Sequence, residues 1–179
     1  MRSFAVAAAV LLSVPALLPA QAITQEQALK MAFPAPLRVE RRTAYLDEAQ
    51  LARARDLAGS KDITHRVVTY YVGSNNGTVA GTAYFDSHRV RTHGEVLMIV
   101  VDKEWQIERI EVLRFAEPPE YRASEKWLDQ FEGKRLSQNL SLKRDIVPMT
   151  GATLTANAIT SAARRVLALH TIISASSKR

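Results

Sequence analysis

Residues 145–155 hold the side chains whose types and spacing point most clearly to chemistry. They read Asp-Ile-Val-Pro-Met-Thr-Gly-Ala-Thr-Leu-Thr and run directly into an apolar-periodic segment that predicts a helix. A helix start offers unpaired backbone N–H groups and a positive dipole end, both of which suit a phosphate. Gly151 allows a bulky group to approach the backbone closely. The stretch therefore predicts an anion site built from a hydroxyl-rich turn.

An ordinary helix cap is the alternative interpretation of the same residues. Threonine is a favoured N-cap residue, because its side-chain oxygen accepts a hydrogen bond from a free backbone N–H of the first helical turn. Thr150 or Thr153 could serve in this way without binding any ligand. The choice between the two interpretations depends on the rest of the chain.

The N-terminus has the order of a secretory signal peptide. A positively charged start, Met1-Arg2-Ser3, precedes an almost wholly apolar run over residues 4–18 and an Ala-x-Ala site at residues 20–22. The sequence thus predicts a signal peptide over residues 1–22, a mature chain that starts near Ile23, and a periplasmic protein. An uncleaved membrane anchor is the alternative, although the apolar run is short for a bilayer.

Composition narrows the redox chemistry that an exported chain of this kind could perform. The chain has no cysteine, which excludes disulfides, thiolate-bound iron–sulfur clusters and Cys-x-x-Cys-His haem attachment. If the protein carries electrons, an organic cofactor must hold them. The formal charge of +6 suits acidic partners or anionic lipid, or simply a solvated surface. Nucleic acid is not expected as a partner, because aromatic-rich basic repeats are missing.

Hydrophobic periodicity and turn signals predict an α+β domain, with an antiparallel sheet of about four strands and flanking helices. Asn75-Asn76-Gly77 predicts a tight hairpin turn. The strands are expected at 65–72, 78–85, 95–102 and 107–114, with a weaker candidate at 37–45 and a polar connection at 86–93. Helices are expected at 24–33, 47–57, 124–131 and 154–170, and a frayed tail at 174–179.

Three motifs in this order resemble the FMN-binding domain family, which includes flavoprotein subunits of sodium-pumping quinone reductases and related ferredoxin-linked complexes. Residues 150–153 resemble its [Ser/Thr]-Gly-Ala-[Ser/Thr] flavin motif. Residues 127–134 follow its Trp-x-x-Gln-Phe-x-Gly-Lys helix, in which Trp127, Phe131 and Gly133 are expected to serve packing and the helix end. Residues 117–119, Glu-Pro-Pro, take the place of its Glu-Thr-Pro-Gly loop without the Thr and Gly. The agreement extends over residues 78–170.

This resemblance implies FMN bound covalently through a phosphoester bond to Thr153, within a core over residues 78–173 that residues 23–77 complete. A threonine hydroxyl is a weak nucleophile, so a separate, magnesium-dependent flavin transferase is implied as the partner that moves FMN from FAD. The family commonly has an Asp three residues before the motif, whereas Asp145 lies five before Thr150. Asp145 is therefore either part of the attachment site or a surface carboxylate. The remaining cofactor-binding residues implied are Thr150, Gly151, Ala152, Leu154, Thr155, Glu117, Pro118 and Pro119.

The two histidines of the segment 86–93 raise the question of a metal site. His88 and His93 lie near Asp86 and Glu95 in the sequence, but a metal needs three convergent ligands with an ordered second shell. We expect capping and surface hydrogen bonds there and no metal. Arg89 and Arg91, in the basic segment 88–91, could hold an anionic ligand or partner.

Together these patterns favour an electron-transfer protein over a stand-alone enzyme. The expected protein takes electrons from a membrane-bound donor and passes them to a periplasmic or membrane acceptor, at the outer face of the inner membrane. Two alternatives remain open. One is a cofactor-free exported α+β binding module, and the other is a flavin-dependent reductase of a small periplasmic acceptor.

Overall fold

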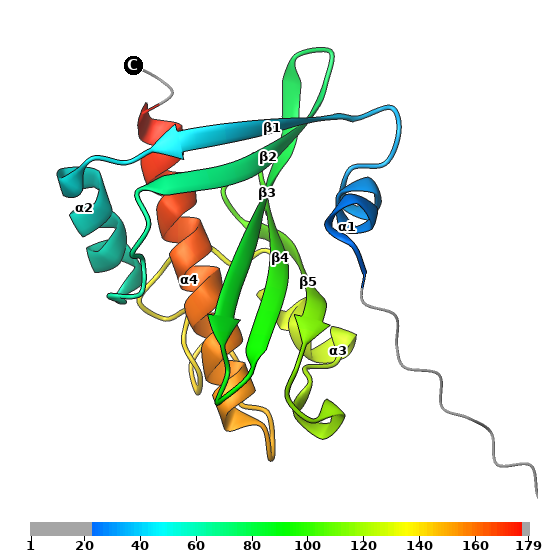
Figure 1. Cartoon of the computed structure of the whole chain (residues 1–179), viewed down its shortest axis with the longest axis vertical. Coiled ribbons are helices and arrows are strands. Elements are labelled where there is room, and N and C mark those ends of the chain that lie inside the picture. Colours follow the sequence, from blue (N-terminus) through cyan, green and yellow to red (C-terminus); the bar gives the residue numbers. More distant parts are fainter. Residues whose placement is uncertain (1–22, 177–179) are drawn as a thin grey trace, which may run out of the picture.

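The computed structural model describes residues 23–176, in which a five-stranded antiparallel sheet with the order β1-β2-β3-β4-β5 carries helices on both faces (Figure 1). The α+β prediction is confirmed. The sheet has five strands because the weaker strand candidate pairs along its whole length with the next strand. The predicted signal peptide and residues 177–179 lie outside the described part of the chain.

The elements follow the predicted order. The strands are β1 (Arg38–Tyr45), β2 (Val67–Asn75), β3 (Thr78–Arg89), β4 (Gly94–Asp102) and β5 (Ile107–Phe115). The helices are α1 (Gln25–Ala32), α2 (Glu48–Ala58), α3 (Glu125–Leu128) and α4 (Thr153–Ser176), with 3-10 turns η1 (Pro119–Tyr121) and η2 (Asp129–Phe131).

Two elements are longer than the sequence predicts. β3 continues to Arg89, well into the segment predicted as a polar connection, because its second half pairs with β4. α4 continues to Ser176, past the point where the frayed tail was expected, because apolar residues such as Ile172 and Ile173 keep packing into the core.

Side-chain caps fix where the first three helices begin. At α1 a capping box is present, as the Thr-x-x-Gln pattern of residues 24–27 predicts: the Gln27 N–H donates to Thr24 Oγ1 (3.2 Å) and the Thr24 N–H donates to Gln27 Oε1 (2.9 Å). Asp47 and Gln50 form the same arrangement at α2. Ser124 accepts from the backbone N–H of Trp127 at α3. Each cap satisfies N–H groups that a helix start leaves unpaired.

The centre of the sheet is buried on both faces, and β4 shows why. Leu97, Ile99 and Val101 point into a core shared with α2 and α4, whereas Met98 and Val100 pack under α1 with Phe33. All five of these β4 residues are fully buried. A strand covered on both sides reads as a continuous apolar run, which is what the sequence of β4 shows. The sheet is therefore a rigid support for whatever α4 and the strand ends carry.

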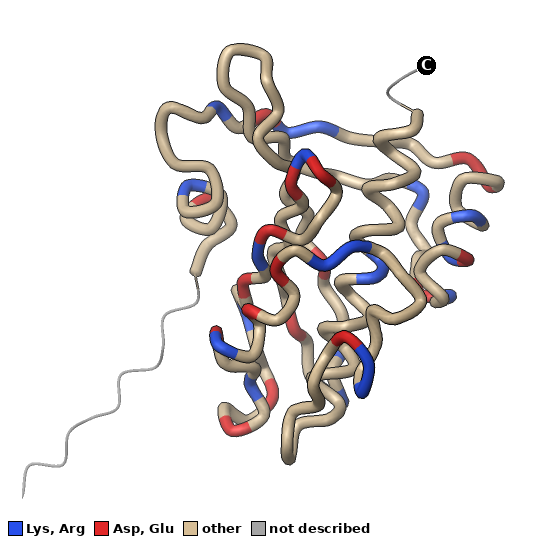
Figure 2. Tube along the Cα trace, turned by 180° about the vertical axis from the view of Figure 1, so that it is seen from behind, with Lys and Arg blue, Asp and Glu red and all other residues tan. Residues whose placement is uncertain are grey.

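Basic and acidic residues are interspersed along the described chain (Figure 2). Among residues 23–176, no helix has both the length and the apolar character that crossing a membrane requires.

Candidate functional site

The hydroxyl-rich turn lies at the start of α4, as the sequence predicts. Thr153 is the first residue of the helix, and Thr150 and Gly151 form the turn before it. Gly151 has a φ of 78° and a Cβ built on it would meet nothing within 4 Å, so the turn needs glycine for its left-handed backbone and faces open space. Thr153 is exposed, and so is Leu154 after it, at 51%.

The helix-cap interpretation of the two threonines is not what the structure shows. Within residues 23–176, neither the Thr150 nor the Thr153 hydroxyl takes part in a hydrogen bond. Ala152, which precedes the helix and is buried, has no side-chain acceptor. Unlike α1, α2 and α3, α4 thus starts with N–H groups that no described side chain satisfies, and the positive end of its 24-residue dipole is open.

The backbone leading into this turn is held by the Trp-x-x-Gln helix. The indole Nε1 of Trp127 donates to the Val147 carbonyl (2.9 Å), and the Val147 N–H donates to Gln130 Oε1 (2.7 Å). Gln130 is itself fixed by a 2.7 Å bond from its Nε2 to the Trp127 carbonyl. Phe131 is fully buried, as expected for a packing residue. Trp127, which was expected mainly to pack, also positions the residues that lead to the Thr-Gly-Ala-Thr motif.

A cavity of about 300 Å³ opens beside the turn and brings three distant segments together. It is lined by residues 151–155, by Val90 and Arg91 after β3, and by Glu117 and Tyr121 around η1. Glu117 and Thr153, both of which the resemblance implies as cofactor-binding residues, thus line the same cavity. Arg91 was noted only as a general anion binder, and Val90 and Tyr121 were not foreseen, because nothing in their local sequence marks them.

Glu117 is held as a carboxylate in this cavity. Its Oε1 accepts from the backbone N–H groups of Thr92 (2.8 Å) and His93 (2.9 Å), and its Oε2 lies 3.4 Å from His93 Nδ1. These hydrogen bonds lower the pKa of Glu117 to about 2, with the Thr92 N–H the largest cause. A carboxyl group with so low a pKa is a poor base, and it serves better as a fixed hydrogen-bond acceptor.

Four other residues implied by the resemblance do not line the cavity, namely Thr150, Pro118, Pro119 and Asp145. Thr150 is exposed in the turn just before the lining residues 151–155. Pro118 and Pro119 are exposed and instead start the η1 turn that carries Tyr121. Asp145 is exposed in the turn between Leu142 and Ile146, and its N–H donates to the Asn139 carbonyl (3.1 Å).

His88 and His93, the two candidate metal ligands, each lie against different carboxylates. His88 lies between Asp86 and Glu95, and His93 lies against Glu117. In the described part of the chain, no group of three histidine, cysteine or acidic residues is arranged to hold a metal ion.

A comparison of the sequence with known protein families identifies the family of the segment that carries most of this site. Residues 93–168 match the FMN-binding domain family, over β4, β5, α3 and most of α4. These residues form an FMN-binding domain. No curated protein and no solved structure matched the chain. Val90 and Arg91 precede the matched range, so the segment after β3 adds two residues to the cavity of this FMN-binding domain.

The residues of the cavity fit an FMN group. The phosphate needs N–H donors and a cation, which the open start of α4 and the guanidinium of Arg91 provide, and Arg91 forms no ion pair within residues 23–176. The flavin ring carries an imide N–H that needs an acceptor, and Glu117 is a fixed one. When bound, FMN supplies one- and two-electron redox chemistry. The domain thus has a flavin-binding redox role.

Proposed function

We propose that the chain is a periplasmic electron-transfer flavoprotein whose FMN is attached to Thr153 through a phosphoester bond. It takes electrons from a membrane-bound redox protein and delivers them to a periplasmic or membrane acceptor. The observation that carries this proposal is the state of Thr153: an exposed hydroxyl without a hydrogen-bond partner in residues 23–176, on the first residue of an uncapped helix, lining the cavity of an FMN-binding domain.

Attachment needs a separate, magnesium-dependent flavin transferase. In the step we propose, the Thr153 oxygen forms a bond to the phosphorus of the FMN half of FAD, the pyrophosphate bond breaks, and AMP leaves. The hydroxyl proton must pass to a base, because a threonine hydroxyl is a poor nucleophile on its own. Glu117 is a poor candidate because of its low pKa of about 2. The transferase therefore supplies the base.

A permanent tether is useful to an exported flavoprotein. Free flavin is scarce outside the cytoplasm, and a covalent link removes the entropic cost of rebinding the cofactor. The same link keeps the ring next to Glu117 and Arg91 through every redox cycle. The two residues would then hold the flavin while the chain exchanges electrons with its partners.

The proposal is tested by co-expressing the chain with a flavin transferase and weighing the product. We expect a yellow protein whose mass is greater than that of the chain by one FMN less one water. Thr153→Ala should remove this increment completely, and Thr153→Ser should restore it because the hydroxyl returns.

Thr150→Ala is the matched control, because Thr150 is also exposed and has no hydrogen-bond partner among residues 23–176, but lies in the turn before the helix. It should keep the full increment. A colourless wild-type product of unmodified mass would overturn the covalent proposal, and an increment that persists in Thr153→Ala would move the attachment to another residue.

A further inference from the structure

A second and larger cavity lies next to the flavin cavity, where β2 and β3 separate. The β2–β3 ladder ends at the pair Tyr70 and Tyr84, but β3 continues to Arg89, paired over this length only with β4 among the described strands. We call the resulting space the wedge. It has a volume of about 1000 Å³ and is bounded by residues 62–65, the start of β2, the end of β3 and one face of α4.

The α4 face explains why the wedge is hollow. The lining residues recur at helical spacing, and the middle of the stripe is made of small residues, Ala158 and Ser161. Leu154 and Leu169 close the two ends. Val90 and Leu154 line both the wedge and the flavin cavity. A molecule in the wedge would therefore lie beside the flavin that we propose on Thr153.

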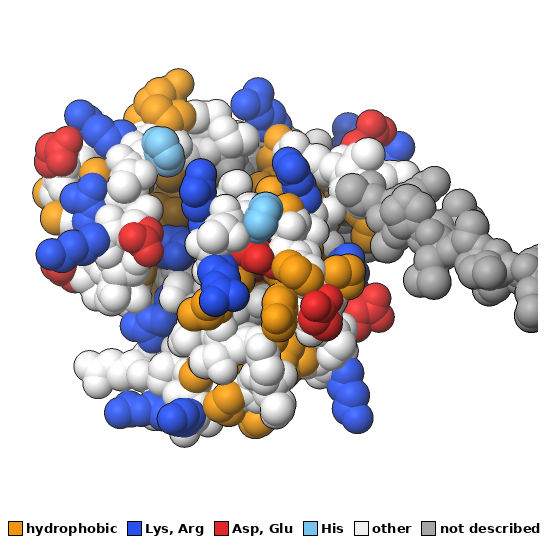
Figure 3. Space-filling model, turned by 60° about the horizontal axis from the view of Figure 1, so that its bottom comes forward, with side chains coloured by type: hydrophobic (Ala, Val, Ile, Leu, Met, Phe, Trp, Pro, Cys, Tyr) orange, Lys and Arg blue, Asp and Glu red, His pale blue; other side chains and the backbone are white. Residues whose placement is uncertain are grey.

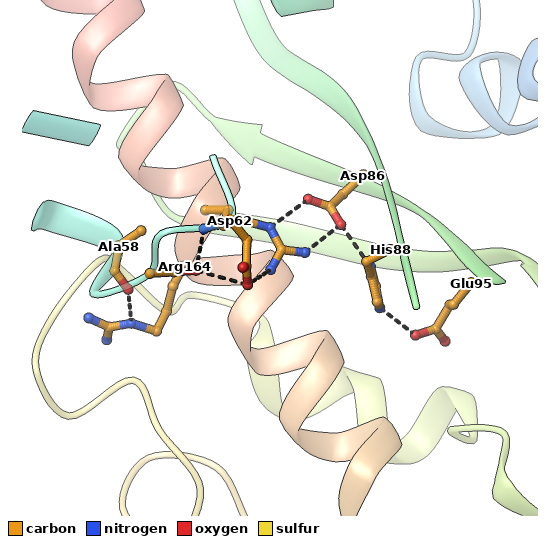
Figure 4. A network of polar contacts seen from close by, with 8 residues as sticks. Ala58, Asp62, Asp86, His88, Glu95 and Arg164 are labelled. Atoms are coloured by element: carbon orange, nitrogen blue, oxygen red, sulfur yellow. Dashed lines mark hydrogen bonds and ion pairs between the residues drawn. The ribbon is translucent and has the colours of Figure 1, made fainter. Parts of the chain in front are cut away.

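A rigid group of four charges forms one wall. Arg165 binds both oxygens of Asp86 (2.7 and 3.1 Å), and His88 Nδ1 lies 2.8 Å from Asp86 Oδ1 (Figure 4). His88 Nε2 lies 2.9 Å from Oε2 of Glu95, which is fully buried. The carboxylates of Asp86 and Glu95 raise the pKa of His88 to about 9 against its partial burial. Two cations and two anions thus cancel within this wall.

The cations that remain are at the rim. Arg41 and Arg89 line the wedge and form no ion pair or side-chain hydrogen bond within residues 23–176. Among the described residues that line the wedge, Asp62 is the one acidic residue outside this neutral wall. Its side chain is exposed, and its Oδ2 lies 4.0 Å from Arg165 Nη1. The view from below shows a hollow with hydrophobic side chains in its depth and basic side chains and a histidine around it (Figure 3). Phe85, Val68 and Leu169 supply apolar lining.

We propose that the wedge is a binding site for a small organic anion with an apolar body, such as an aromatic carboxylate or sulfonate. The two free guanidinium groups would hold the anionic group, and the apolar lining would hold the body. The site is defined by the chain alone. Its role as a place where a small molecule meets the flavin rests on the function proposed above.

The test uses the full processed chain produced without a flavin transferase, with 8-anilinonaphthalene-1-sulfonate as the fluorescent probe. We expect saturable binding of one probe per chain, displaced by benzoate and not by benzyl alcohol at equal concentration. The double variant Arg41→Gln with Arg89→Gln should raise the dissociation constant roughly tenfold or more, since each charged hydrogen bond carries about that factor.

Arg38→Gln with Arg114→Gln is the matched control, because it removes the same charge from exposed arginines that do not line the wedge. It should bind the probe like the wild type. Urea midpoints of all three proteins should agree, which excludes probe binding to a loosened fold. Equal affinities for the two double variants, equal displacement by benzyl alcohol, or no binding would each overturn the proposal. The covalent FMN proposal would stand in all three cases, because no flavin is present in this experiment.

Discussion

At the scale of single residues, His88 shows how the fold controls a protonation state beside the flavin cavity. Its side chain is 11% exposed, and both ring nitrogens lie within 2.9 Å of a carboxylate oxygen. An imidazole in this position donates from both nitrogens only when it is charged. The second oxygen of Glu95 is buried without a partner in the described residues. The charged imidazole ring thus offsets the desolvation cost of burying the carboxylates of Asp86 and Glu95.

This arrangement predicts how stability depends on pH. A histidine whose pKa rises from 6.5 to about 9 on folding contributes stability that is fully present below pH 6.5 and is lost as the pH rises through 9. We expect the free energy of unfolding to fall on the order of 2–3 kcal/mol over this window. Urea titrations from pH 6 to 10 measure it.

The pH dependence of the free energy of unfolding must be compared with that of a variant at a second histidine, one that lacks these contacts. His88→Gln should be less stable than the wild type at pH 6 and should lose most of this pH dependence. His65→Gln should behave like the wild type, because His65 is exposed and forms no described ion pair. If the wild-type and His88→Gln curves run parallel from pH 6 to 10, His88 does not carry the effect.

At the scale of elements, the connection between η2 and α4 decides where the turn before Thr153 lies. Gln130 on η2 is bonded to both the Val147 N–H and the Trp127 carbonyl. We predict that Gln130→Ala frees residues 147–152 and slows FMN attachment by a flavin transferase, while the final mass increment stays the same. The cost in stability should be about 1 kcal/mol, the net value of an ordinary hydrogen bond.

Asp129→Ala is the control for this variant, because Asp129 is the exposed neighbour on the same turn and has no described side-chain hydrogen bond. A time course of intact mass during the transferase reaction separates rate from extent. An unchanged rate in Gln130→Ala would mean that the turn keeps its place without this clamp.

The elements also show which features of the fold and the site local sequence patterns predict and which they do not. The strands, the Asn76-Gly77 turn and the capping box of Thr24 follow from local patterns, and each is found. The motif at Thr153 could be located because a short motif with a helix behind it is a local signal. Local patterns could not place Arg91 in the cavity or predict Tyr121 and the wedge, because these features depend on where β2 separates from β3 and on how η1 turns toward α4. These are long-range consequences of packing.

At the scale of the whole molecule, the flavin site is built on one continuous core. The start of α4 and the segments that follow β3 and β5 supply its walls, and α4 and β4 also pack into the cluster between the sheet and α2. A group that binds only the folded chain stabilises it by mass action. A tethered group does so at an effective concentration of roughly millimolar, independent of dilution. Attached FMN should therefore stabilise the fold as a unit.

The last prediction concerns this coupling. The flavinylated chain should unfold at a higher urea concentration than its Thr153→Ala counterpart, and its flavin fluorescence should change in the same transition as the far-ultraviolet circular dichroism. In concentrated guanidinium, the flavin should elute with the unfolded chain on a gel-filtration column, because a phosphoester bond does not depend on the fold. Flavinylated Thr150→Ala, which keeps the attachment residue, should match the wild type in both measurements. Flavin that elutes as a small molecule would show that FMN was held by the pocket alone and not by a covalent bond. Identical urea midpoints for the flavinylated chain and Thr153→Ala would show that the ring does not contact the folded pocket that Glu117 and Arg91 line.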